Sequence, residues 1–259
     1  LNMILRHLIT FTILFYCNTL LAQNTRLNTH EQIGWYNIFG TFKVGKKISL
    51  HTEYQWRRND FIKSWQQSLL RVGVNYHINP RVVARLGYAW IETFPYGDIP
   101  INGLGRDFTE HRIFEMLQLN HKEGIVGISH RFMLEQRFVG RYSSALSKKE
   151  DEFPLLNRIR YMPRFQVPLK GKMNEPKSAY LALYDEIFIG FGKNVTNNIF
   201  DQNRIGILLG YQFNKIIKIE AGYLNQTIQF GRQINGQAVF QHNNGFIFNT
   251  NLNLDLTRK

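Results

Sequence analysis

The sequence predicts an all-β fold: an antiparallel up-and-down transmembrane β-barrel of ten to twelve strands, with twelve preferred. Aromatic residues make up 14% of the chain, including 20 Phe and 12 Tyr, and aromatic side chains favour pleated sheets. Apolar and polar residues alternate in segments of about ten residues, as they do in membrane-facing strands. Tight turns and long loops also alternate along the chain, as they do at the two rims of an outer-membrane barrel.

The alternation with a period of two is clearest in the last segment, residues 238–256. There Leu252, Leu254 and Leu256 alternate with Asn253 and Asp255, whereas a helix would distribute these residues around its circumference. The same pattern defines eleven predicted strands, at residues 31–43, 48–58, 65–78, 82–93, 108–121, 125–138, 155–167, 179–191, 203–213, 217–230 and 238–256.

An odd number of strands is unusual, because bacterial single-chain barrels usually have an even number. A twelfth strand has two candidate places. It either lies in residues 23–31 or results from a split of the last segment at Asn244-Gly245, a dipeptide favoured in type I′ hairpin turns. A soluble two-sheet sandwich has the same periodicity and is the structural alternative.

The predicted connections support the barrel, because most of them alternate between short and long. Tight turns are expected at residues 45–47, 78–80, 122–124 and 214–215, and long connections at residues 94–107, 139–153, 192–202 and 231–237. Residues 168–178 depart from this order as a long connection on the short-turn side.

Residues 1–22 have the pattern of a secretory signal peptide that is cleaved after Ala22. A single barrel domain of residues 23–259 is then the mature protein, and we expect it in the bacterial outer membrane. A lipoprotein signal at Cys17 is disfavoured, because Tyr16 occupies a position that needs a small residue. Cleavage removes the only cysteine, which excludes thiolate metal sites and cysteine nucleophiles from the mature chain.

The chain is strongly basic, with 32 Lys and Arg against 19 Asp and Glu. Loss of the leader removes Arg6 and no acidic residue, so the formal net charge falls from +13 to +12. A positive protein attracts anionic surfaces within a Debye length. For an exported protein we therefore expect outer-membrane lipid and lipopolysaccharide as partners, and no nucleic acid.

If the apolar faces contact lipid, the polar faces form a charged lumen. The candidate lumen residues are Glu110, Arg112, Arg131, Glu135, Arg137, Arg158, Arg160, Arg164, Asp185, Arg204 and Glu220. One interpretation is an ion-paired interior that keeps the barrel closed, and it is favoured because an unpaired buried charge costs several kcal/mol. The other is an anion-selective pore or ligand pocket, in which Arg131, Arg158, Arg160 and Arg164 attract the anion.

No residue set in the sequence specifies a reaction, so an enzyme is the less favoured class. His111 and Glu115 share a strand face, whereas Ser129 and His130 are neighbours and point to opposite faces. The histidines show no spacing typical of a metal site, and the sequence indicates no cofactor. Two alternatives to a structural or narrow-pore barrel stay open: an outer-membrane barrel enzyme acting on lipid or peptide, and a soluble periplasmic β-protein that binds a ligand.

Several aromatic residues lie near the ends of predicted strands. Trp35, Trp56, Trp65, Tyr88 and Trp90 are among them. Amphipathic rings gather at the level of the lipid headgroups in membrane barrels. The sequence therefore predicts aromatic girdles on the outer surface.

Six short segments together resemble the barrel family catalogued as domain of unknown function 2490. They are residues 110–115 (Glu-His-Arg-Ile-Phe-Glu), 157–161 (Asn-Arg-Ile-Arg-Tyr), 184–189 (Tyr-Asp-Glu-Ile-Phe-Ile), 201–204 (Asp-Gln-Asn-Arg), 210–213 (Gly-Tyr-Gln-Phe) and 222–226 (Gly-Tyr-Leu-Asn-Gln). The resemblance implies a single exported β-barrel domain, treated as an outer-membrane protein. It implies no assigned reaction and supplies no catalytic residues.

Overall fold

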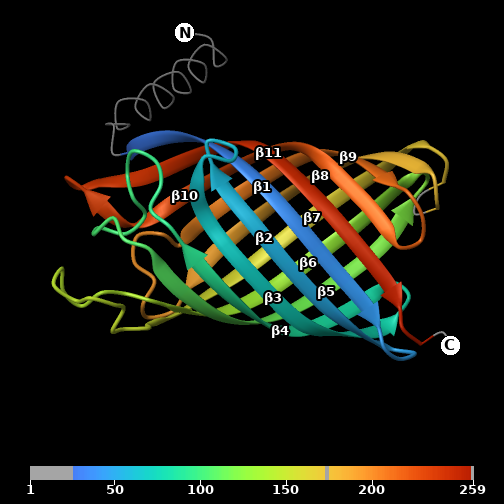
Figure 1. Cartoon of the computed structure of the whole chain (residues 1–259), viewed down its shortest axis with the longest axis horizontal. Helices are drawn as coiled ribbons and strands as arrows, with labels where there is room; N and C mark the ends of the chain where they lie inside the picture. Colours follow the sequence, from blue (N-terminus) through green and yellow to red (C-terminus); the bar gives the residue numbers. More distant parts are fainter. Residues whose placement is uncertain (1–25, 173–174, 258–259) are drawn as a thin grey trace, which may run out of the picture.

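The protein folds as one closed β-barrel of eleven strands in a computed structural model that describes residues 26–172 and 175–257 (Figure 1). The strands are β1 (Arg26–Lys43), β2 (Ile48–Asn59), β3 (Ser64–Asn79), β4 (Val82–Thr93), β5 (Phe108–Glu123), β6 (Val126–Val139), β7 (Leu155–Lys170), β8 (Ser178–Phe191), β9 (Phe200–Gln212), β10 (Ile217–Ile234) and β11 (Gln237–Asp255). The prediction of an all-β barrel with ten to twelve strands is confirmed. The predicted leader, including Cys17 and the cleavage position, lies outside the described residues.

The barrel closes through a parallel pair of strands, β1 and β11, whereas all the other neighbouring strands are antiparallel. The parallel register runs without interruption from Arg26 opposite Ala238 to Lys43 opposite Asp255. Parallel closure is what makes an odd number of strands possible, because β1 and β11 then run in the same direction. The strand count is therefore eleven and not the preferred twelve.

The chain contains two Asn-Gly dipeptides in this region, and only the first forms a turn. Asn235 and Gly236, with φ angles of 50° and 75°, form the two-residue hairpin between β10 and β11, as expected for a type I′ turn. The predicted split at Asn244-Gly245 is wrong, because this dipeptide lies inside the continuous strand β11. Gly245 is needed there for close strand approach: a Cβ atom would lie 1.8 Å from the carbonyl oxygen of Ile33.

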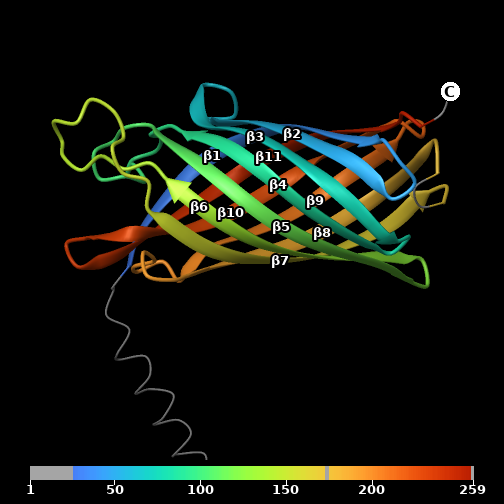
Figure 2. The same ribbon diagram turned by 90° about the horizontal axis from the view of Figure 1, so that it is seen from below.

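The three longest connections lie at one end of the barrel, together with the short β2–β3 and β10–β11 connections (Figures 1 and 2). The long connection predicted at residues 231–237 is wrong, because β10 continues to Ile234 and only two residues separate it from β11. We call the end with residues 94–107, 140–154 and 192–199 the loop end, and the end with the short β1–β2, β3–β4, β5–β6 and β9–β10 connections the turn end. β1 begins at the loop end and β11 finishes at the turn end (Figure 1). Among the described residues, no helix has the length and apolarity of a membrane span.

The two faces of the strands differ in chemistry. Every strand exposes at least one large apolar side chain on the outside of the barrel, including Ile38 on β1, Leu50 on β2, Val74 on β3, Leu86 on β4, Ile113 on β5, Phe132 on β6, Ile159 on β7, Leu183 on β8, Leu209 on β9, Tyr223 on β10 and Phe246 on β11. The alternate positions point inward and are buried, many of them polar or charged. The period of two in the sequence therefore separates an apolar outer surface from a charged interior.

Outward aromatic rings do pack in a row, which runs through Tyr36, Trp56, Trp65 and Phe94. Trp35, which the sequence places in the same girdle, is an exception because it faces the lumen and is only 3% exposed. Its position follows from the alternation along β1, where the neighbouring Tyr36 occupies the outer face.

Part of the lumen wall is apolar. Ile33, Trp35, Tyr180, Tyr184 and Leu208 belong to a buried cluster on the inner face of β1 and β8–β11. Two glycines make room for its tyrosines: a Cβ at Gly206 or Gly210 would lie within 2.3 Å of the ring of Tyr184 or Tyr180. The charged side chains of the lumen thus face a wall of closely packed apolar residues.

The parallel register predicts a specific cross-link. Ile38 and Thr250 are register partners on the outer face of β1 and β11, so in a Cys17→Ser background the pair Ile38→Cys and Thr250→Cys should form a disulfide on oxidation. Gel mobility with and without reductant measures the formation of this disulfide. The control pair Ile38→Cys and Phe246→Cys is offset by four residues, or roughly 13 Å, too far for a disulfide. Cross-linking of the control pair alone would contradict the register.

Candidate functional site

The candidate site is the interior of the barrel, where a cavity of about 520 Å³ extends from Tyr96 near the loop end to His77 and Asn251 near the turn end. Of the described residues, eleven arginines and lysines and five carboxylates line this cavity. Glu135 is a sixth inward carboxylate, fully buried in the wall. The interior therefore has a formal excess of five positive charges.

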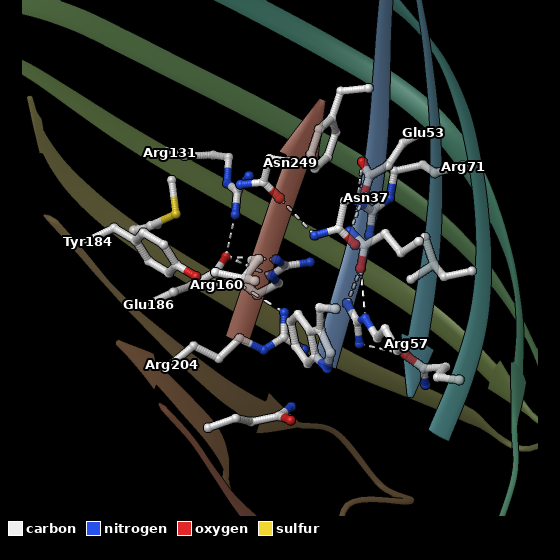
Figure 3. Close-up of a pocket in the computed structure, with 18 of the residues that line it drawn as sticks. Asn37, Glu53, Arg57, Arg71, Arg131, Arg160, Tyr184, Glu186, Arg204 and Asn249 are labelled. Atoms are coloured by element: carbon white, nitrogen blue, oxygen red, sulfur yellow. Dashed lines mark hydrogen bonds and ion pairs between the residues drawn. The ribbon is translucent and has the colours of Figure 1, made fainter. Parts of the chain in front are cut away.

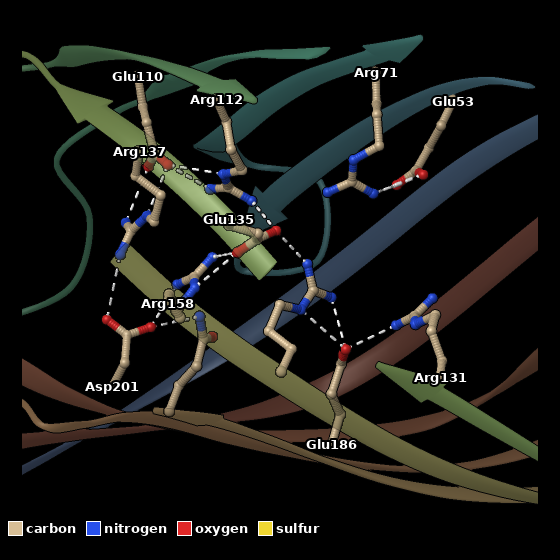
Figure 4. Close-up of polar contacts among 12 residues, drawn as sticks. Glu53, Arg71, Glu110, Arg112, Arg131, Glu135, Arg137, Arg158, Glu186 and Asp201 are labelled. Carbon is tan, nitrogen blue, oxygen red and sulfur yellow. Dashed lines mark hydrogen bonds and ion pairs between the residues drawn. The ribbon is translucent and has the colours of Figure 1, made fainter. Parts of the chain in front are cut away.

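Glu135 on β6 is the centre of the charged network (Figure 4). Its two carboxylate oxygens accept hydrogen bonds from three arginines: Arg112 Nη1 at 3.0 Å, Arg158 Nη2 at 2.6 Å and Arg160 Nη1 at 2.7 Å. The register places Arg112, on β5, and both β7 arginines on strands that flank Glu135. One carboxylate thus holds three neighbouring strands through charge-assisted hydrogen bonds.

Glu135 also belongs to a closed ring in which carboxylates alternate with arginines (Figure 4). Glu110 accepts from Arg112 Nη2 at 2.6 Å and from Arg137 Nε at 2.8 Å. Asp201 completes the ring, with its carboxylate oxygens 2.5 Å from Arg158 Nη1 and 3.5 Å from Arg137 Nη1. In such a ring each charge has two opposite neighbours, which offsets the desolvation cost better than an isolated pair does.

The network continues along the lumen through Glu186 on β8. Its Oε1 atom accepts from Arg160 Nη2 at 2.7 Å and from Arg131 Nη2 at 2.8 Å, and its Oε2 atom lies 3.9 Å from Arg204 Nη1. Phe188 supports these arginines from the same strand, because its ring lies 4.4 Å from Arg160 Cζ and 4.5 Å from Arg204 Cζ. β8 therefore contributes both a carboxylate and an aromatic face.

Two further groups of charges lie apart from this network. Glu220 accepts from Arg164 Nη2 and from the Tyr180 hydroxyl, both at 2.6 Å. Glu53 accepts from Arg71 Nη1 at 2.7 Å, as Figure 4 also shows, and its carboxylate lies 3.2 Å from His51 Nε2.

Ten of the eleven predicted lumen residues face the interior, and Asp185 does not. Asp185 is exposed on the outer face, where it accepts a hydrogen bond from Asn203 Nδ2 at 2.5 Å. The inward carboxylate of this pair is Glu186, because Leu183 and Ile187 share the outer face with Asp185 and neighbouring strand residues point to opposite faces. The structure brings seven of the predicted residues into the network around Glu135 and holds Arg164 with Glu220 in a separate group. The only carboxylate of the described residues within ion-pair distance of Arg204 is Glu186, at 3.9 Å.

Seven further lumen charges were not among the predicted residues: Glu53, Arg57, Arg71, Arg85, Glu186, Asp201 and Lys218. The alternation in residues 48–58 already places Glu53 and Arg57 on a polar face, so that signal was present. No sequence pattern predicts the inward position of Asp201, because it turns inward at an irregularity in the β8–β9 register, between Phe188 and Ile189.

The catalytic candidates from the sequence do not come together. His111 contacts the Tyr88 hydroxyl and Phe153, whereas Glu115 is exposed and accepts a hydrogen bond from Gln136. Ser129 lines the cavity, while the neighbouring His130 stacks on Tyr161.

A serine–histidine pair that sequence reasoning missed joins β2 and β3. Ser49 Oγ lies 2.9 Å from His77 Nε2 and accepts a hydrogen bond from Asn75 Nδ2 at 3.0 Å. Only the β2–β3 register could have revealed this pair. The described residues include no group of three or more histidines, cysteines or carboxylates placed to hold a metal.

The loop between β4 and β5, residues 94–107, folds over the loop end and inserts Tyr96 into the lumen. The Tyr96 hydroxyl donates to Gln241 Oε1 at 2.8 Å and accepts from Gln66 Nε2 at 2.9 Å and Asn243 Nδ2 at 3.1 Å. Burial raises the pKa of Tyr96 to about 12, so the hydroxyl stays protonated. This loop therefore narrows the entrance at the loop end.

Tyr96→Phe should loosen this loop, because three buried amide side chains lose their common partner. Each of the three lost hydrogen bonds is worth about 0.5–1.5 kcal/mol, so local opening should become at least about tenfold more frequent. Hydrogen–deuterium exchange of a peptide covering residues 94–107 measures this opening in the detergent-solubilised protein. The control is Tyr223→Phe, which removes an outward hydrogen bond to Asn244. Unchanged protection in Tyr96→Phe would show that Tyr96 does not hold the loop.

A comparison with curated proteins gives no match. A comparison with family models gives one that covers residues 32–236. This range runs from β1 to the β10–β11 turn, so it contains the whole carboxylate–arginine network. The chain therefore belongs to the family described as "Protein of unknown function (DUF2490)".

Proposed function

We propose that this chain is a bacterial outer-membrane β-barrel whose lumen is a narrow, positively charged passage with a largely ion-paired wall. The observation that carries the proposal is the opposite chemistry of the two faces of the same strands. The outer face exposes large apolar side chains on all eleven strands, and the inner face holds the charged network.

An exposed apolar band around a whole barrel is unfavourable in water, because soluble monomers rarely expose contiguous apolar patches larger than a few hundred Å². A lipid environment removes that cost, since closed barrels satisfy their backbone hydrogen bonds internally. This favours an outer-membrane barrel over the soluble periplasmic alternative. The net positive charge is consistent with anionic lipid and lipopolysaccharide as its surroundings.

A narrow passage follows from the contents of the lumen. Barrels of about eight strands are filled by side chains, while those of about 16 leave a water-filled channel. The eleven-strand barrel lies between these sizes, and its interior holds the arginine–carboxylate network and Tyr96. The excess of five positive charges on the lumen wall favours the passage of anions over that of cations.

Fractionation of the expressed protein tests the proposed location. We expect it with the outer membrane, and we expect the folded barrel to migrate differently from the boiled protein on a gel. Recovery of the protein in the soluble periplasmic fraction would contradict the proposal, and its apolar outer face would then need another cover.

Conductance in planar lipid bilayers tests the proposed passage. We expect small single-channel currents, and a reversal potential under a KCl gradient that reports preference for chloride over potassium. A preference for potassium, or currents as large as those of a general porin, would contradict the narrow, positively charged lumen.

A further inference from the structure

Some lumen arginines are held by side-chain amides instead of carboxylates. Arg57 Nε donates to Gln55 Oε1 at 2.7 Å and Arg57 Nη1 donates to Gln67 Oε1 at 2.6 Å, and Arg57 Nη2 also donates to Gln55. No carboxylate of the described chain lies within ion-pair distance of Arg57. An amide oxygen orients a guanidinium but carries no net charge to neutralise it.

Arg204 on β9 has a similar environment. Its Nε and Nη2 atoms donate to Gln202 Oε1 at 3.2 Å and 3.0 Å. Its closest carboxylate, Glu186, is 3.9 Å away and already accepts shorter hydrogen bonds from two other arginines. The positive charge of Arg204 is therefore only partly balanced.

Trp35 brings these two arginines together. Arg57 Cζ lies 3.8 Å and Arg204 Cζ 4.9 Å from the centroid of the Trp35 ring, and the ring itself is anchored because its Nε1 atom donates to Gln66 Oε1 at 2.7 Å. Figure 3 shows Arg57 and Arg204 directed into the same part of the cavity. Strands β1, β2 and β9, far apart in sequence, thus place two under-neutralised guanidiniums around one indole.

Both guanidiniums keep free hydrogen-bond donors. Each has five N–H groups, of which three in Arg57 and two in Arg204 donate to the amides described above. Both residues line the lumen cavity. The charge and the geometry are therefore both available to a ligand.

We propose that Arg57 and Arg204 form a binding site for a small oxyanion, of the size and chemistry of phosphate, within the lumen. Guanidinium forks match the oxygen geometry of such anions, and a bound anion would supply the counter-charge that the amides do not. The proposal deepens the proposed function, on which it rests for the route by which an anion arrives. The proposal distinguishes two classes of lumen arginine. In one class, carboxylates of neighbouring strands balance the positive charge, and in the other the charge is not fully balanced within the protein and can bind a ligand.

Gln202→Glu is the variant that tests the site. It is nearly isosteric and gives Arg204 an internal carboxylate, so it should compete with the anion. The matched control is Gln118→Glu, which adds the same charge to the cavity wall on β5, at a position hydrogen-bonded to Asn120, whereas Arg57 and Arg204 lie on β2 and β9.

Gln67→Glu tests the Arg57 half of the site, because Gln67 Oε1 accepts from Arg57 and, among the described residues, its amide nitrogen contacts only the Thr93 hydroxyl, which can donate to a carboxylate. It replaces Gln202→Glu if that variant does not fold, as judged by gel migration without boiling.

Inorganic phosphate is the probe, titrated into the detergent-solubilised barrel at constant ionic strength and followed by calorimetry. Emission from Trp35 gives a second signal, which Trp35→Phe should remove. We expect saturable binding to the unmodified protein, at least tenfold weaker binding to Gln202→Glu or Gln67→Glu, and less than a threefold change in Gln118→Glu.

Absence of saturable phosphate binding to the unmodified protein would overturn the site, and so would equal weakening in Gln118→Glu, which would indicate a general effect of lumen charge. Saturation by phosphate but equally by chloride at the same concentration would also overturn the oxyanion assignment. This measurement needs neither a membrane nor a current. A barrel that binds phosphate but does not conduct would therefore contradict the passage alone, and one that conducts without binding would contradict the site alone.

Discussion

A carboxylate shared between several arginines is the interaction on which the interior of this barrel depends. Glu135 accepts hydrogen bonds from Arg112, Arg158 and Arg160 and ties together β5, β6 and β7. Charges placed in a narrow lumen lose their hydration, and removal of one partner of a buried pair costs about 3–5 kcal/mol. The ring of alternating charges offsets that loss, which allows a barrel of this size to be filled with arginines.

The closure of the sheet imposes a second constraint. β1 and β11 pair in parallel without interruption along the barrel, and Gly245 allows the two backbones to meet. The odd number of strands then places the start of β1 at the loop end and the finish of β11 at the turn end (Figure 1). On β1, the alternation of side chains turns Trp35 into the lumen, where Arg57 and Arg204 stack on it.

Alternation in the sequence was enough to predict the barrel, the approximate strands and ten of the eleven lumen charges, because strand side chains must alternate between faces. The alternation could not predict the features that depend on strand register. Asp201 turns inward at a local irregularity, and Asn235-Gly236 turns where Asn244-Gly245 does not, although both dipeptides suit a hairpin. The prediction that Asp185 faces the lumen is wrong, and its exposed neighbours Leu183 and Ile187 indicate the outer face.

The most direct test of the central claim is a double-mutant cycle on Glu135 and Arg158, with the free energy of unfolding measured by urea titration in detergent. Glu135→Gln and Arg158→Met should each be strongly destabilising, and the double variant should recover part of the loss, with a coupling energy of about 1–3 kcal/mol. Glu115→Gln, a change on the exposed outer face, is the control and should shift stability by less than about 0.5 kcal/mol. Additive effects of Glu135→Gln and Arg158→Met would contradict the account.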